Sequence, residues 1–383
     1  MVGMILPEKV IGIIGGGQLG KMLAIAAQTL GFKVVIWSEE ENCPACGVAT
    51  STIIGKYTDK NKLKLFIQQI DIATVETEHI PLFILKELAK VVPLYPDVNI
   101  IGTAQNRKKE KQWLTNNHFP IAPFQIISSI EDIITFQQHF GEIVVKTATG
   151  GYDGKGQFRL SNQELTRDEE DKIINWLENG DELIAEAWLA IRKEFSVIAA
   201  RNISGSFVSF PIMENEHRNQ ILYRTIVPAR IDESITNNAI KISQGIMEKL
   251  DYVGLLCIEY FYDEQGKVYI NELAPRPHNS GHYTLDAAIT SQFEQTIRAI
   301  TGFPLGSIAS LSPSVMINLL GEDLENGFIL EKILAEPSAK LHLYGKKEAR
   351  EKRKMGHFTT LAKSMEEALR ISEDLYLSLK AKV

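Results

Sequence analysis

The chain has few of the features that would place a protein in a membrane or outside the cell. None of the apolar runs in its 383 residues reaches the roughly 18 residues of a membrane span. The amino-terminal segment "MVGMILPEKV" is too short and irregular for a secretory signal. Three cysteines are too few for a disulfide framework and indicate a reducing compartment. We therefore expect a cytoplasmic protein.

Blocks of charge of one sign are also missing. The net charge is −7 and no long run of either sign occurs, which gives no support for nucleic acid or an anionic membrane as a partner. Cys43 and Cys46 form a C-P-A-C pair, but a zinc site needs two more ligands and the third cysteine, Cys257, is far away in the sequence. We interpret the pair as part of a loop that follows a strand.

Apolar strands and amphipathic helices alternate over the first hundred residues. "KVIGII", "KVVIW" and "DIATVET" read as strands, with helical segments between and after them, and this alternation predicts a parallel, doubly wound α/β sheet. From about residue 120 the strands come in hairpin-like pairs, which predicts an α+β region. We expect a Rossmann-like domain over residues 1–104, a larger domain over 105–305 and a small C-terminal domain over 306–383.

A glycine-rich loop lies between the first expected strand and the first expected helix. In "IGIIGGGQLGKML", Gly15, Gly17 and Gly20 fit the G-x-G-x-x-G fingerprint of dinucleotide-binding proteins. A nicotinamide cofactor would also need an acid at the end of the second strand, where Glu39 is only roughly placed. Because glycines and a helix N-terminus attract any phosphate, the loop alone does not identify its ligand.

The segment "LLCIEYFYDEQGKVYINELA" predicts a β-hairpin with two facing carboxylates. If its turn is centred between Gln265 and Gly266, Glu259 and Glu272 lie directly opposite on one face. Two carboxylates that close repel each other unless a cation lies between them or one is protonated. Both strands are otherwise strongly apolar, which favours a Mg²⁺ site over a solvent-facing pair.

Three further segments carry polar side chains of possible function. "VVKTATGGYDGKGQ" is not a Walker A loop, but a glycine-rich hairpin with Lys146 and Lys155 can still cover phosphates. "LAPRPHNSGH" places Arg276, His278 and Asn279 directly after the expected metal strand, where they suit a small oxyanion. "GKKEAREKRKMGH" is basic, and from the residues alone it reads as a solvated loop.

In this order, these segments resemble the ATP-grasp ligases, and more closely the 5-(carboxyamino)imidazole ribonucleotide synthases. The matching stretches include "GGGQLGKML", "NRKKEKQWL", "KTATGGYDGKGQ", "NELAPRPHNSGH" and "YGKKEAREKRKMGH", and they span roughly residues 11 to 360. The resemblance implies an ATP-grasp fold with a pre-ATP-grasp domain at its N-terminus and a lid at about residues 115–185. It also implies a reaction in which MgATP phosphorylates bicarbonate to carboxyphosphate. The amine of 5-aminoimidazole ribonucleotide then takes up the carboxyl group, through CO₂ released in the closed site.

The resemblance further implies roles for individual residues. ATP would be bound by Arg107, Lys146, Gly151, Tyr152, Asp153, Gly154, Lys155, Gly156, Gln157, Glu186, Ala187, Trp188, Leu189, Glu194, His217, Asn271 and Glu272. Bicarbonate or carboxyphosphate would be held by Arg276, His278 and Asn279, and Mg²⁺ by Glu259 and Glu272. The ribonucleotide would be bound by Gly17, Gln18, Leu19, Glu78, Tyr152, Asp153, Lys346 and Arg353. A homodimer is also expected.

The chain departs from the family pattern around Glu78. Thr77 and His79 stand where the family usually has an aromatic residue and an asparagine. Three alternatives remain open at this point: another ATP-grasp carboxylase or a formyl-phosphate-using transferase that acts on a purine precursor, a nicotinamide-dependent oxidoreductase, and a nucleotide-binding regulator without turnover.

Overall fold

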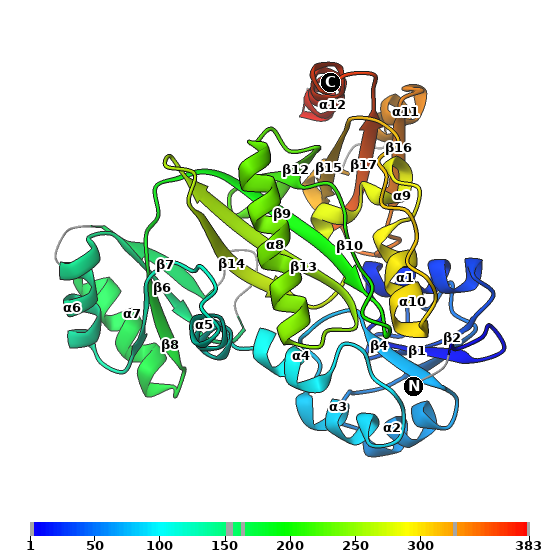
Figure 1. Cartoon of the computed structure of the whole chain (residues 1–383), viewed down its shortest axis with the longest axis horizontal. Coiled ribbons are helices and arrows are strands. Elements are labelled where there is room, and N and C mark those ends of the chain that lie inside the picture. Colours follow the sequence, from blue (N-terminus) through cyan, green and yellow to red (C-terminus); the bar gives the residue numbers. More distant parts are fainter. Residues whose placement is uncertain (1–3, 151–155, 162–164, 325–327, 381–383) are drawn as a thin grey trace.

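The computed structural model describes residues 4–150, 156–161, 165–324 and 328–380. Three sheets organise this part of the chain (Figure 1). No helix in the described ranges is long and apolar enough to cross a membrane.

The N-terminal sheet is parallel and doubly wound, as the alternating pattern predicts. Its order is β3-β2-β1-β4, with β1 in the middle paired to β2 and β4. The short strand β3 is not anticipated, since its four residues carry little pattern of their own. The elements are β1 (Val10–Ile14), α1 (Gln18–Thr29), β2 (Lys33–Ser38), β3 (Ser51–Ile54), α2 (Lys60–Ile67), β4 (Ile72–Val75), α3 (Leu82–Ala89) and α4 (Val98–Ala104).

A second, antiparallel sheet of order β5-β8-β6-β7 stands apart at the left of Figure 1, with α6 and α7 packed beside it. The predicted hairpin of "EIVVKTA" and "GQFRL" is confirmed as β6 and β7. The elements are α5 (Arg107–Asn116), β5 (Phe124–Ile127), α6 (Ile130–Phe140), β6 (Ile143–Thr147), β7 (Gln157–Leu160), α7 (Arg167–Glu178) and β8 (Leu183–Ala187).

The third sheet has nine strands in the described ranges, in the order β14-β13-β9-β11-β12-β15-β17-β16, with β10 paired to β9. Its first part comprises β9 (Ile191–Arg201), β10 (Phe207–Ser209), β11 (Met213–Arg218), β12 (Ile221–Val227), α8 (Glu233–Lys249), β13 (Gly254–Asp263) and β14 (Val268–Ala274). Strands β10 and β11 pair separately with β9, and the break between them contains Pro211, which has no N–H to donate.

The same sheet continues into the C-terminal residues. Strand β15 pairs with β12, so no sheet edge separates the two parts of the chain. The remaining elements are the short helix η1 (Asn279–Gly281), α9 (Thr284–Ala287), α10 (Gln292–Thr301), β15 (Ser314–Leu320), η2 (Gly321–Asp323), α11 (Phe328–Ala335), β16 (Ala339–Leu343), β17 (Lys354–Leu361) and α12 (Met365–Lys380). Helix α10 packs against α1, which joins the large sheet to the N-terminal sheet.

A disulfide joins Cys43 and Cys46. The loop expected after β2 is confirmed, and the disulfide within it was not predicted. The two Cα atoms lie 5.1 Å from each other, within the range that a disulfide spans. The third cysteine, Cys257, is free and buried in β13.

Candidate active site

The glycine-rich loop before α1 wraps around a carboxylate that sequence reasoning missed. Glu76, directly after β4, accepts hydrogen bonds from the N–H of Gly17 at 2.5 Å and from the N–H of Gly20 at 2.6 Å. A Cβ atom at Gly15, whose φ is +122°, would lie 2.1 Å from the Glu76 side chain. The glycines therefore make room for Glu76. Burial raises the pKa of this carboxyl group.

This arrangement changes what the loop can bind. A phosphate at the N–H groups of Gly17 and Gly20 would compete with the Glu76 carboxylate, so the phosphate expected at this loop does not fit those two groups. The N–H groups of Gln18 and Leu19, in the first turn of α1, have no intrahelical acceptor. A neutral ligand group, such as a sugar hydroxyl, fits this place better than an anion.

Strands β13 and β14 place Glu259 opposite Glu272, as predicted. The register near the turn is one residue different from the expected one, because Tyr260 pairs with Ile270. A β-bulge at Asn271 restores the Glu259–Glu272 pairing. It also leaves Asn271 and Glu272 opposite a single residue, and Asn271 Nδ2 donates to Glu259 Oε2 at 3.4 Å. The bulge thus brings three oxygen-bearing side chains together.

The two carboxyl groups are electrostatically coupled. His278 Nε2 lies 3.1 Å from Glu259 Oε1. Although burial opposes its ionisation, this hydrogen bond holds the pKa of Glu259 below its ordinary value. Burial and then the charge of Glu259 raise the pKa of Glu272. A divalent cation between the two carboxyl groups would therefore offset their repulsion, and their hard oxygen donors fit Mg²⁺.

His217 and Glu194 extend this cluster from the neighbouring strands. His217 Nδ1, on β11, lies 2.7 Å from Glu194 Oε2, on β9. Burial opposes protonation of His217, but the hydrogen bond that it donates to Glu194 and the charges of Glu194 and Glu259 raise its pKa. The structure therefore brings these two expected ATP ligands to the metal-ligand candidates.

Arg276 does not stand free beside the acidic pair but binds Glu78 of the N-terminal region. The contact is bidentate, with Nε–Oε2 at 2.5 Å and Nη2–Oε1 at 3.1 Å, and both side chains are largely buried. Burial opposes ionisation of Glu78, but the Arg276 charge lowers its pKa to about 2. The predicted bicarbonate ligand and a predicted ribonucleotide ligand therefore meet. An anion at Arg276 has to share it with Glu78.

The loop after β14 is held by a residue that the sequence did not single out. Gln292, fully buried at the start of α10, accepts from the N–H of His278 and donates to the O of His278 at 2.8 Å. Next to it, both polar side-chain atoms of Asn279 are buried without a hydrogen-bond partner among the described residues. Because an unpaired buried amide is costly, Asn279 is a natural contact for a bound oxyanion.

The expected nucleotide residues around the second sheet are linked by ion pairs. Glu186, on β8, lies 2.9 Å from Lys146 Nζ and 3.3 Å from Lys111 Nζ. Burial opposes its ionisation, but Lys111 and then Lys146 lower the pKa of Glu186 to about 2. Arg107 Nη1 donates to the O of Thr147, at the end of β6.

The rest of the expected nucleotide site is less fully described. Trp188, expected to bind ATP together with Ala187 and Leu189, is 44% exposed, and its ring lies under the guanidinium group of Arg159. Gly151, Tyr152, Asp153, Gly154 and Lys155 lie outside the described residues, while Gly156 and Gln157 lead into β7.

Two consecutive residues of α5 form hydrogen bonds with the bulge of β14, and neither residue was predicted to contribute to the site. Lys111 Nζ donates to the O of Asn271 at 2.9 Å, and Glu110 Oε2 accepts from the N–H of Leu273 at 3.1 Å. These bonds flank Glu272 on both sides. Since helix and bulge are some 160 residues apart in sequence, no local pattern could have indicated this contact.

Glu110 gives a pH-dependent prediction. Burial, opposed by the Lys111 charge, raises the pKa of Glu110 from its ordinary 4.5 to about 8. A carboxyl group whose pKa is raised on folding stabilises the fold fully below its unfolded pKa and loses that contribution as the pH rises through the folded value. We expect the unfolding free energy of Glu110→Gln to fall less than that of the wild type between pH 5 and 9, by on the order of 4 kcal/mol. Urea unfolding at several pH values measures this difference. The exposed Glu178→Gln is the control, and parallel curves for Glu110→Gln and wild type would contradict the prediction.

The basic C-terminal segment approaches the glycine-rich loop rather than standing in solvent alone. Lys346 is close enough to Glu76 and Arg353 for each charge to act on it, and burial, then the Arg353 charge, lower its pKa to about 8. Lys21 Nζ, from α1, donates to the O of Tyr344 at 3.3 Å. Two partly buried cations repel each other, and a bound anion such as phosphate would offset this repulsion.

Comparison with known families gives a consistent assignment along the chain. The "Ribonucleotide synthetase preATP-grasp domain" matches residues 8–105, the "ATP-grasp domain" residues 112–293 and the "Phosphoribosylaminoimidazole carboxylase C-terminal domain" residues 314–371. The expected ATP-grasp fold with its N-terminal and C-terminal domains is thereby confirmed.

Individual relatives agree over nearly full length. N5-carboxyaminoimidazole ribonucleotide synthase of Bacillus subtilis is 39% identical over 365 residues, 95% of this chain and 94% of that protein. The synthase of Staphylococcus aureus strain COL is 42% identical over 369 residues, 96% of this chain and 95% of that protein.

Solved structures agree as well. The S. aureus enzyme complexed with ADP has a TM-score of 0.91 at 38% identity, with 98% of both chains covered. The Aspergillus clavatus enzyme in complex with ADP and 5-aminoimidazole ribonucleotide has a TM-score of 0.89 at 28% identity, covering 97% of this chain and 98% of that one. The resemblance drawn from the sequence is confirmed, and the oxidoreductase alternative is wrong. The chain belongs to the N5-carboxyaminoimidazole ribonucleotide synthase family, ATP-dependent ATP-grasp ligases of purine biosynthesis.

Proposed function

We propose that this chain carboxylates 5-aminoimidazole ribonucleotide with bicarbonate, at the expense of ATP and with Mg²⁺, through carboxyphosphate. The observation that carries the proposal is the contact between Arg276 and Glu78. It brings the segment that follows the acidic pair against the N-terminal region, where the ribonucleotide is proposed to bind. Phosphorylation and carboxylation are thus proposed to take place next to each other.

The two steps of the reaction are assigned to the two sides of the Arg276–Glu78 contact. A bicarbonate oxygen attacks the γ-phosphorus of ATP, ADP leaves, and carboxyphosphate decomposes to phosphate and CO₂. The exocyclic amine of the ribonucleotide attacks the CO₂ carbon and loses a proton, which gives the carbamate product. Asn279 and Arg276 are proposed to hold the oxyanion, and His278 to hold Glu259 in place. Mg²⁺, when bound by Glu259 and Glu272 with Asn271 beside them, would neutralise charge on the phosphates.

The ribonucleotide is proposed to lie between the glycine-rich loop and the basic segment. Lys346 and Arg353 supply positive charge for its 5′-phosphate, and Gln18 and Leu19 present N–H groups that suit its sugar hydroxyls. Glu78 is proposed to belong to the same ribonucleotide site. ATP is proposed to be held by Arg107, Lys146, residues 151–157 and Glu186–Leu189. We also propose the domain division at residues 104 and 305, a cytoplasmic location and a homodimer.

Omission of single substrates tests the proposal. We expect ADP release to require both bicarbonate and 5-aminoimidazole ribonucleotide, because carboxyphosphate is formed and consumed in one site. The measurement follows ADP and carboxylated product with each substrate left out in turn. Full ADP release with formate in place of bicarbonate would move the reaction to the formyl-transferring class, and nucleotide binding without any ADP release would make the chain a regulator.

A further inference from the structure

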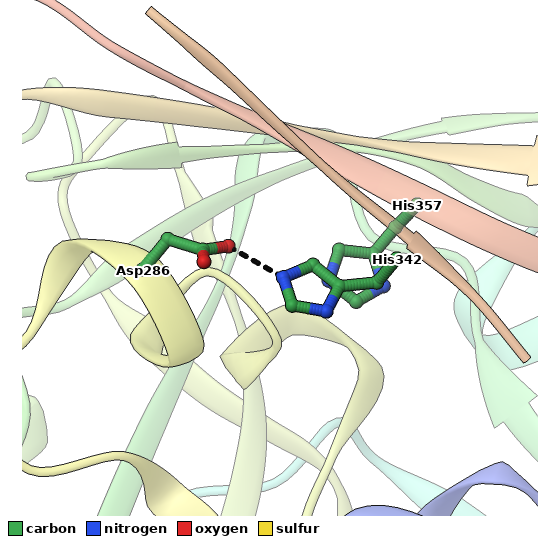
Figure 2. A group of neighbouring side chains, drawn as sticks. All are labelled: Asp286, His342 and His357. Carbon is green, nitrogen blue, oxygen red and sulfur yellow. Dashed lines mark hydrogen bonds and ion pairs between the residues drawn. The ribbon is translucent and has the colours of Figure 1, made fainter. Parts of the chain in front are cut away.

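A group of three metal-binding side chains lies outside the candidate active site. His342 on β16 and His357 on β17 are directly paired across the two strands, and Asp286 reaches them from α9 (Figure 2). One ligand atom of each residue lies within 4.8 Å of the others. Residues from two strands and a helix far apart in sequence therefore present a carboxylate and two imidazoles to one place.

His357 has an unused ring nitrogen in this group. The residue is fully buried, and its Nε2 makes no hydrogen bond among the described residues. Its Nδ1 lies 3.0 Å from the hydroxyl group of Tyr344. If Nδ1 donates its proton to Tyr344, Nε2 carries a lone pair without a partner, and leaving such a group unpaired in the interior costs free energy. A metal-bound histidine commonly has this second hydrogen bond on its other nitrogen.

His342 and Asp286 provide the other two ligands, and the partial exposure of His342 gives an ion access from solvent. His342 Nε2 lies 2.8 Å from Asp286 Oδ2, and the His342 side chain is 33% exposed. Figure 2 shows both imidazole rings extending toward Asp286. The His342 and His357 rings are stacked, with centroids 4.7 Å apart. Because the ligand atoms of a tetrahedral zinc ion lie about 3.3 Å apart, the rings must tilt so that their ligand nitrogens approach by about 1 Å.

We propose that Asp286, His342 and His357 form a binding site for a divalent transition-metal ion of the zinc class, separate from the acidic pair. Imidazole nitrogens select zinc, cobalt or nickel over magnesium, and a water molecule completes a four-coordinate shell. The ion joins the β16–β17 hairpin, whose connecting segment carries Lys346 and Arg353, to α9, which follows the segment that contains His278. Its role is to fix the C-terminal hairpin against α9.

Cobalt titration tests the site without relying on turnover. Excess Mg²⁺ is kept present to compete at Glu259 and Glu272. We expect the full-length protein to bind one equivalent of Co²⁺, with a visible absorption spectrum of a four-coordinate site and a raised melting temperature. Removal of a ligand in His342→Ala, and of the ligand charge in Asp286→Asn, is expected to weaken binding at least tenfold.

The control is His139→Ala, which removes an exposed histidine on α6 that belongs to no such group among the described residues. It is expected to bind Co²⁺ like the wild type. Melting curves without metal show whether the variants are folded, and Asp286→Asn keeps the shape of the side chain if His342→Ala does not fold. Equal Co²⁺ affinity in Asp286→Asn and wild type, or no stoichiometric binding by the wild type, would overturn the proposal.

Discussion

Replacement of Glu272 by glutamine is expected to lower kcat by at least two orders of magnitude. Glu272 and Glu259 face each other across β13 and β14, and a divalent cation between them is proposed to stabilise the charge that develops on the transferred phosphate. Such stabilisation is worth several kcal/mol, and each 1.4 kcal/mol corresponds to about tenfold in rate. Glu259→Gln is expected to have a similar effect. The double variant is expected to be little worse than the worse single variant, because residues that act as a unit are not additive.

The measurement is kcat and KM for MgATP at several Mg²⁺ concentrations, for wild type and the three variants. Glu264→Gln, in the exposed turn of the same hairpin, is the matched control and is expected to be unchanged. Additive losses in the double variant would show that the two carboxylates do not share an ion.

Removal of the Arg276 side chain is expected to reduce kcat by roughly 10²- to 10³-fold, the typical loss for one preorganised donor to a developing oxyanion. ATP binding should remain largely intact, because Arg276 contacts Glu78 rather than the Lys146–Glu186 pair. We also expect ADP release to exceed product formation in Arg276→Ala, since carboxyphosphate would be held less well and would reach water. ADP and carboxylated product are measured in the same reaction.

The buried ion pair calls for a second variant. Arg276→Ala leaves the Glu78 carboxylate buried without its cation, which typically costs 3–5 kcal/mol of stability. Arg276→Ala/Glu78→Gln removes that charge and should recover stability without recovering activity. One product per ADP at near-normal kcat in Arg276→Ala would place the bicarbonate site elsewhere.

Local pattern predicted most of the secondary structure and the main acidic pair. The alternation of the first hundred residues gave the parallel sheet, and the spacing of Glu259 and Glu272 gave a correct facing pair. The turn centre behind that second prediction was half a residue off, which changes the register near the turn by one residue. The pairing holds because the bulge at Asn271 shifts the register back. A bulge depends on contacts with another element, here Lys111 and Glu110 of α5, and these contacts leave no trace in the hairpin's own sequence.

Most of the site features that could not be predicted depend on long-range contacts. The glycine fingerprint pointed to a bound phosphate, whereas Glu76, 59 residues after Gly17, occupies two of its N–H groups. Arg276 and Glu78 are 198 residues apart. From the sequence they were assigned to different ligands, and only the fold shows that they form an ion pair. The disulfide between Cys43 and Cys46 was open to sequence reasoning, but a short spacing alone does not distinguish a bonded pair from a free one.

The continuous pairing from β12 to β15 has a consequence for how the C-terminal residues can be handled. They form part of one sheet with the preceding strands, so they are not a detachable module. A chain cut before Ser314 would leave β12 without its partner from Arg224 to Val227, and unsatisfied backbone groups of this kind are a template for pairing with other chains. Shuffling or fusing segments of such enzymes at this junction would therefore produce aggregating fragments rather than functional halves.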